Sequence, residues 1–132
     1  MKKSLFALLL CMLPLLAVAA PKSDAKGTPA ISFSTKSHDF GTIRENAGPV
    51  SHEFTFTNTG SAPLIIISAT ASCGCTRPSY PTEPIRPGKS AKIKVTYLPK
   101  GRPGEFAKNV KIRTNAPSAK KVTLKISGTV IP

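Results

Sequence analysis

Two cysteines separated by a single glycine, Cys73 and Cys75, are the residues of this 132-residue chain best suited to chemistry. In an extended segment, side chains two residues apart point to the same face, with Cα atoms about 6.6 Å apart, near the upper limit for a disulfide. Gly74 allows the chain to bend and bring the sulfurs together in a small, strained ring, which would be easy to reduce. Closing so short a loop is expected to stabilise the fold little.

Three interpretations of this pair remain open. The first is a local disulfide, or two half-buried thiols, that orders the loop. The second is a soft-metal site, because two thiolates suit Cu(I), or Zn(II) with further ligands, and His52 is the candidate third ligand of such a site. The third is an exposed redox dithiol. Gly74 and Thr76 complete the segment and are expected to belong to the same binding loop, whereas His52 also fits a hydrogen-bonded position at the rim of the core.

The N-terminal residues predict export, which bears on the oxidation state of the cysteines. Met1-Lys2-Lys3 is a positive start, an apolar run follows from residue 5 to residue 18, and Ala17-Val18-Ala19 is a small-residue cleavage site. The run contains Pro14 and is shorter than the roughly 20 apolar residues that span a bilayer. We therefore expect residues 1–19 to be a signal peptide, and the mature chain, without a transmembrane span, to be periplasmic, at the cell surface or secreted.

After a polar stretch at residues 20–30, which we expect to be a flexible lead-in, apolar and polar side chains alternate along residues 31–132. The clearest strand has Ala91, Ile93, Val95 and Tyr97 on one face and Lys92, Lys94 and Thr96 on the other. Turn-forming residues recur at the spacing typical of a β-sandwich. The sequence thus predicts one all-β domain, an immunoglobulin-like antiparallel β-sandwich of about seven strands.

Several local patterns qualify this prediction. The apolar run from Leu64 to Ile67 favours a strand buried on both faces or at the centre of a sheet. Four prolines between residues 76 and 87 favour an extended loop or a broken edge strand. Lys108 interrupts an inward face and predicts a bulge or a strand end there, and His38, beside Asp39, is expected in a surface turn.

The formal net charge of +13 favours an anionic partner, such as acidic polysaccharide, lipid headgroups or nucleic acid. Outward lysines also have a simpler explanation, because they keep strand edges soluble. Nucleic acid is the least expected partner, since most of the few aromatic residues lie on inward faces and leave no stacking platform. No two of the six acidic residues have a recognisable catalytic spacing, so we do not expect an enzyme.

The sequence carries six short segments in a fixed order between Ile31 and Ile131. They are Asp39-Phe40-Gly41-Thr42-Ile43, the run from His52 to Gly60, Pro63-Leu64-Ile65-Ile66, Ser72-Cys73-Gly74-Cys75-Thr76, Ile85-Arg86-Pro87-Gly88-Lys89 and Gly128-Thr129-Val130. As a set they resemble the bacterial domain of unknown function 1573 family. The resemblance implies an exported immunoglobulin-like sandwich and places the recurrent Cys-Gly-Cys-Thr motif of that family on residues 73–76, but it implies no activity.

Two hypotheses of function follow from these observations. The primary one is an exported, non-enzymatic binding or structural module without a cofactor. Its partner would be an unknown protein or an anionic component of the envelope, and one version pairs an exposed edge strand with a client. The alternative is a periplasmic copper- or zinc-binding or thiol-redox protein that uses Cys73 and Cys75.

Overall fold

The alternating pattern of the sequence forms two stacked β-sheets in the computed structural model, which describes residues 27–132. The predicted signal peptide and most of the predicted lead-in lie outside the described residues. The elements are β1 (Ile31–Phe33), β2 (Ser37–Arg44), the 3-10 helix η1 (Glu45–Ala47), β3 (Val50–Asn58), β4 (Ile66–Ala71), β5 (Thr76–Ser79), β6 (Ser90–Tyr97), β7 (Gly104–Thr114) and β8 (Lys121–Ile131). Within this part of the chain, no helix is long and apolar enough to cross a membrane.

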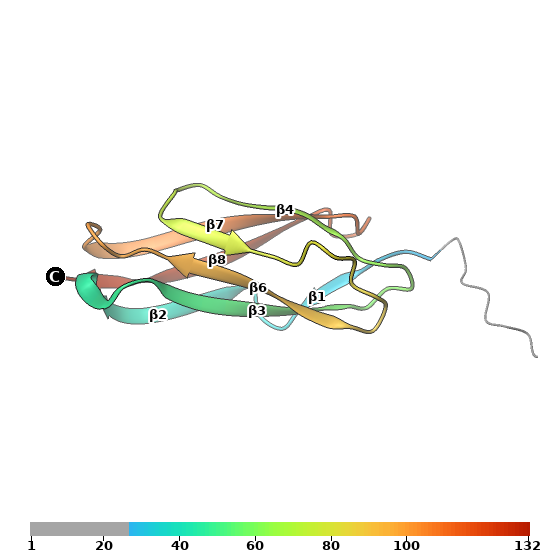
Figure 1. Ribbon diagram of the computed structural model, residues 1–132, viewed down its shortest axis with the longest axis horizontal. Helices are drawn as coiled ribbons and strands as arrows, with labels where there is room; N and C mark the ends of the chain where they lie inside the picture. Colours follow the sequence, from blue (N-terminus) through green and yellow to red (C-terminus); the bar gives the residue numbers. More distant parts are fainter. Residues whose placement is uncertain (1–26) are drawn as a thin grey trace, which may run out of the picture.

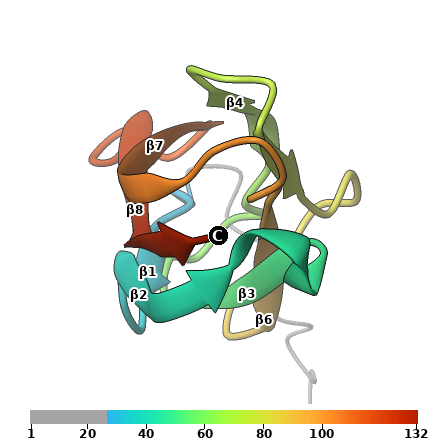
Figure 2. The ribbon, with the colours of Figure 1, turned by 90° about the vertical axis from the view of Figure 1, so that its left-hand side faces the viewer.

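One sheet has the strand order β1-β3-β6-β5 and the other the order β2-β8-β7-β4. The strands run along the long axis of the molecule, and the end-on view shows the two layers (Figures 1 and 2). The predicted all-β sandwich is confirmed, with eight strands against an expected seven or so. Pairing is antiparallel except between β2 and β8, which are parallel because the chain crosses from one sheet to the other after Phe33.

Side-chain parity decides which face of each strand is buried. In β6, Ile93, Val95 and Tyr97 are at most 1% exposed, whereas Lys92 and Lys94 are exposed. The Tyr97 ring stacks on Phe106 of β7 with the ring centroids 3.9 Å apart, which joins the two sheets. Each such large apolar side chain contributes about 1.5–3 kcal/mol on burial.

A buried amide fastens the end of the sandwich where β1 and β3 meet. The Asn58 side chain is fully buried, and its Oδ1 accepts hydrogen bonds from Gly60 N at 2.9 Å and Ala30 N at 3.4 Å. Its Nδ2 donates to the carbonyls of Ala62 and Ile85, both at 2.8 Å. One side chain thus joins the segment before β1, the turn after β3 and the loop before β6.

Two local expectations are wrong. Lys108 lies inside a continuous β7, which keeps its register with β8 from Gly104 to Arg113, because Lys108 is half-buried opposite Ile126 and needs no bulge. His38 lies within β2 rather than in a surface turn. The ladder irregularity occurs instead beside it, between Asp39 and Thr42.

Candidate functional site

The Cys-Gly-Cys segment is the crossover from β4, at the edge of one sheet, to β5, at the edge of the other. The structure joins the sulfurs of Cys73 and Cys75 in a disulfide, with the Cα atoms 5.2 Å apart. Thr76 N donates to Cys73 O at 3.2 Å, and Leu98 N donates to Cys75 O at 2.8 Å. The crossover is therefore closed on itself and anchored to the end of β6.

The two cysteines differ in exposure. Cys75 is 1% exposed and belongs to the core, its sulfur 3.6 Å from the hydroxyl of the buried Thr76. Cys73 is partly exposed, and Gly74 stands at the tip with no atom within 4 Å of a Cβ added there. An external thiol would therefore reach Cys73 more easily than Cys75.

A hollow of about 370 Å³ adjoins the disulfide at this end of the sandwich. Pro49, Leu98 and Pro99 form its apolar wall, and Lys100 and Arg102 bring positive charge to it. The surface beside the disulfide is therefore apolar with a positively charged margin.

His52 lies apart from the cysteines. It pairs with Val95 on β6, whereas Thr76, next to Cys75, pairs with Tyr97 on the far side of that strand. Its ring stacks instead on His38 of β2, with centroids 3.7 Å apart, and meets Phe54 edge-on. Across residues 27–132, no three His, Cys, Asp or Glu side chains are grouped closely enough to hold a metal ion. The structure thus does not assemble the predicted ligand set of Cys73, Cys75 and His52.

The histidine stack makes stability depend on pH. Burial, and then the neighbouring His38, lower the pKa of His52 from its ordinary value of 6.5, while Glu53 opposes them. Between the lowered pKa of His52 in the folded protein and its ordinary value of 6.5, the unfolded chain binds the proton more readily than the folded protein does. The stability that neutral His52 supplies is therefore present above pH 6.5 and is lost as the pH falls below it.

We therefore expect the free energy of unfolding to decrease between about pH 7.5 and about pH 5.5, and the His52→Gln variant to show a flatter profile. Urea unfolding at three pH values measures this. An unchanged slope in the variant would show that His52 is not the group responsible.

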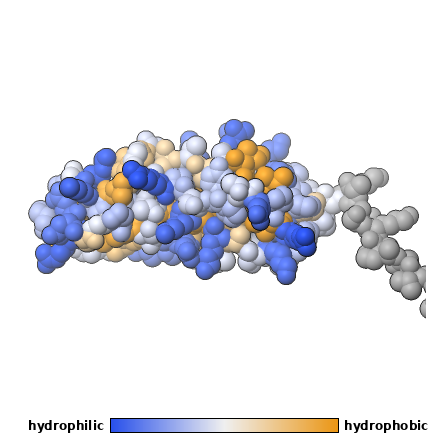
Figure 3. Space-filling view, in the orientation of Figure 1, coloured by the Kyte–Doolittle hydropathy of each residue, from blue (hydrophilic) through white to orange (hydrophobic). Residues whose placement is uncertain are grey.

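The sequence patterns also misplaced the β4 edge. The apolar run of residues 64–67 was expected to be buried on both faces or at the centre of a sheet, but the strand that it leads into is an edge strand. Ile65 is 40% and Ile67 is 54% exposed, while Leu64 and Ile66 are buried. Among the described residues, β7 is the only strand that pairs with β4, which lies at the outer margin of the molecule in Figure 2. Figure 3 shows an apolar patch on the upper side of the molecule, over the β4 region of Figure 1, with hydrophilic side chains beside it.

The outward face of β4 and β7 contains two shallow hollows. One, of about 330 Å³, is lined by Ile67 together with Arg113, Lys121 and neighbouring residues. The other, of about 360 Å³, is lined by Thr70, Lys111 and neighbouring residues. We call the surface formed by Ile67, Ser68 and Thr70 of β4 and by Lys111, Arg113 and Lys121 the β4 face.

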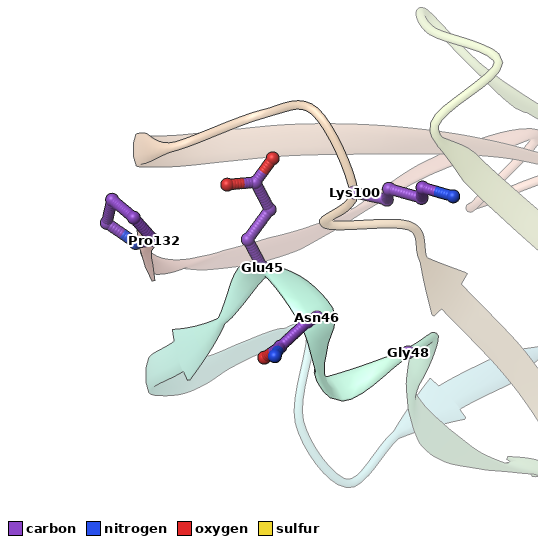
Figure 4. Close-up of a pocket in the computed structure, with 5 residues that line it drawn as sticks. All are labelled: Glu45, Asn46, Gly48, Lys100 and Pro132. Atoms are coloured by element: carbon purple, nitrogen blue, oxygen red, sulfur yellow. The ribbon is translucent and has the colours of Figure 1, made fainter.

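A further hollow, of about 410 Å³, lies beside η1 and is lined by Glu45, Asn46, Gly48, Lys100 and Pro132 (Figure 4). The Glu45 carboxylate points toward the loop after β6 and accepts a hydrogen bond from Gly101 N at 2.8 Å. Lys100 points away from Glu45. The one acidic side chain of this hollow therefore holds the loop in place, which is a structural role.

Residues 31–130 match a protein family described as "Protein of unknown function (DUF1573)". No protein with a curated description matches the sequence. A solved structure of a protein of unknown function from Porphyromonas gingivalis W83 is similar over 77% of this chain and 47% of its own, with 18% identity and a TM-score of 0.68.

Two other similar structures carry domains of this type. The PapD-like domain 7 of human CEP192 is 18% identical over 79% of this chain and 87% of its own, with a TM-score of 0.62. The Escherichia coli chaperone DraB is 11% identical over 79% of this chain and 56% of its own, with a TM-score of 0.53. This chain thus spans about half the length of the two bacterial structures, and at these identities the likeness is one of fold.

Proposed function

This chain belongs to the DUF1573 family, and on that premise we propose that it is an exported, non-enzymatic module that binds an extended segment of an envelope protein by strand addition to the edge of β4. The observation that carries the proposal is the composition of this edge. Its six residues, Ile66-Ile67-Ser68-Ala69-Thr70-Ala71, include no charged residue, no proline and no glycine. Soluble proteins usually protect edge strands with such residues, because an open edge pairs with other chains.

The other edges of the sandwich carry these protections. β5 has four residues, one of which is Pro78, and β1 has three. β2 contains Gly41 at a φ of 69° and loses its register beside it. The part of β3 that β1 leaves uncovered carries Glu53, which forms an ion pair with Lys92 at 3.2 Å. The contrast supports β4 as the edge kept open for a partner.

The geometry of β4 also suits an added strand. A register shift between Ile66 and Ser68 turns Ile67 outward, and regular pairing with β7 follows from Ser68 to Ala71. An added strand would take main-chain hydrogen bonds from this regular stretch and cover Ile67, which gives affinity and a first element of specificity.

Selection from a library of random decapeptides tests the proposal. We expect the selected peptides to be extended, with alternating side chains and without proline at their centre, and to compete with one another for a single site. Selected peptides whose binding is unaffected by changes in β4 would reject strand addition at this edge.

The metal or redox alternative rests on Cys73 and Cys75. The disulfide favours the thiol-redox version, because a metal would first require both sulfurs to be reduced. Titration of the reduced chain with Cu(I) against a competing chelator tests the metal version. If the variant with Cys73→Ser and Cys75→Ser binds copper as well as the parent, this version is excluded.

A further inference from the structure

We infer that the segment bound at β4 alternates acidic and apolar side chains, with the acidic ones toward the β4 face. This inference rests on the proposed function and names the class of partner. It starts from the cations of the neighbouring strands. Lys111 and Arg113 of β7 pair with Thr70 and Ser68 of β4, and Lys121 of β8 pairs with Arg113.

These cations are exposed and have no acidic neighbour in the ladder. β4, residues 109–114 of β7 and residues 121–125 of β8 include no aspartate and no glutamate. Within residues 27–132, the one ion pair joins Lys92 and Glu53 on the outer side of the other sheet. The β4 face is therefore positive, and the stretches of β7 and β8 beside it supply no acidic residue to offset this charge.

The side chains of β4 leave these cations accessible to an added strand. An added strand would lie about 9.5 Å from β7, which is twice the spacing of neighbouring strands. The outward residues between them, Ser68 and Thr70, are short, so long Lys111 and Arg113 side chains can extend across them. Glutamate side chains on the outer face of the added strand would extend toward Lys111 and Arg113 and form ion pairs with them above Ser68 and Thr70.

The inward positions of the added strand face different chemistry. Ala69 and Ala71 are half-buried and pack against the hydrophobic core, and both are small. Apolar side chains of the added strand would cover them, while Ile67 offers a further apolar contact at the outer side. Because strand side chains alternate between faces, the complement of this surface is an acidic–apolar alternation.

Fluorescence anisotropy with three labelled octapeptides tests the inference. They alternate valine with glutamate, with glutamine or with lysine. We expect the glutamate peptide to bind roughly tenfold more tightly than the glutamine peptide at low salt, and the lysine peptide to bind most weakly. This advantage should shrink as the ionic strength rises to about 0.5 M, because salt screens exposed charges.

Charge-neutralising variants locate the effect. The double variant Lys111→Gln with Arg113→Gln should lose most of the preference for the glutamate peptide, while its affinity for the glutamine peptide should be unchanged. Lys94→Gln with Arg77→Gln is the matched control, since it removes the same charge from the exposed side of the other sheet and should not change the preference.

The outcomes separate the inference from the proposed function. If the glutamate and glutamine peptides bind equally and both need Ile67, the inference fails and strand addition stands. If replacement of Ile67 changes the binding of none of the peptides, the inference and the proposed function both fail. If anionic polysaccharide or anionic vesicles bind through Lys111 and Arg113 while the peptides do not, the partner is a polyanion and the inference is overturned.

Discussion

Replacement of Asn58 with alanine is expected to lower the free energy of unfolding by about 3–5 kcal/mol, a large part of the total for a domain of this size. The Asn58 amide makes four hydrogen bonds from a fully buried position. Alanine would leave Gly60 N and Ala30 N without this acceptor and the Ala62 carbonyl without this donor, while the Ile85 carbonyl would keep its bond from Leu64 N. Each buried polar group left unpaired costs about 1–3 kcal/mol. Urea unfolding followed by circular dichroism measures the difference.

Two further variants sharpen this test. Asn58→Asp keeps the acceptor for Gly60 N but turns a carboxylate oxygen toward two carbonyls, so it should be at least as damaging. Thr59→Ala changes the next, exposed residue of the same turn and should stay within about 0.5 kcal/mol of the parent. A loss below about 1 kcal/mol for Asn58→Ala would mean that the amide does not fasten this end of the sandwich.

The second large effect concerns binding. The double variant Ile65→Ser with Ile67→Ser is expected to bind a β4-specific peptide about tenfold to a hundredfold more weakly than the parent. The two side chains are 40% and 54% exposed, so an added strand covers about half of each, and full burial of an isoleucine contributes about 1.5–3 kcal/mol. Titration calorimetry with a selected decapeptide measures the change.

Stability should hardly change in this double variant, because the replaced surface already faces solvent. Ile131→Ser is the matched control: this isoleucine is 37% exposed at the end of β8, away from β4, and should leave affinity unchanged. An equal loss of affinity in Ile131→Ser would show that a general loss of apolar surface, rather than the β4 edge, accounts for the effect.

The sandwich could be predicted because parity is a local property. The alternation of Ile93 and Val95 with Lys92 and Lys94 predicts which face of β6 is buried, and this prediction does not depend on which strands are its neighbours. A glycine inside a strand is a local signal of a bend or bulge, and Gly41 lies where β2 loses its register. The parallel pairing of β2 with β8 could not be predicted, because it depends on where the chain crosses between the sheets.

The candidate site was harder to predict because it depends on which strands are neighbours. In the run from Leu64 to Ile67 every residue is apolar, so the sequence hides the alternation that the structure reveals. Whether a strand is central or at an edge is decided by its pairing partners. The same holds for His52, whose separation from Cys75 follows from the order β3-β6-β5.

The signal that could have located the β4 edge is present in the sequence, although it is weak. After Ile67 the strand continues with Ser68, Ala69, Thr70 and Ala71, which are small and uncharged. The outward positions of β6 and of the neighbouring β7, by contrast, include lysine and arginine. An uncharged outward face beside charged ones is a pattern that indicates a contact surface.

Amide hydrogen exchange of the full chain, with and without a selected decapeptide, tests strand addition at β4 most directly. We predict slower exchange of backbone amides within Ile66–Ala71 when the peptide is bound, because its main chain would take up the hydrogen bonds of that edge, and no change in β2 or β5. Slower exchange in β2 or β5 with unchanged exchange in β4 would contradict the account.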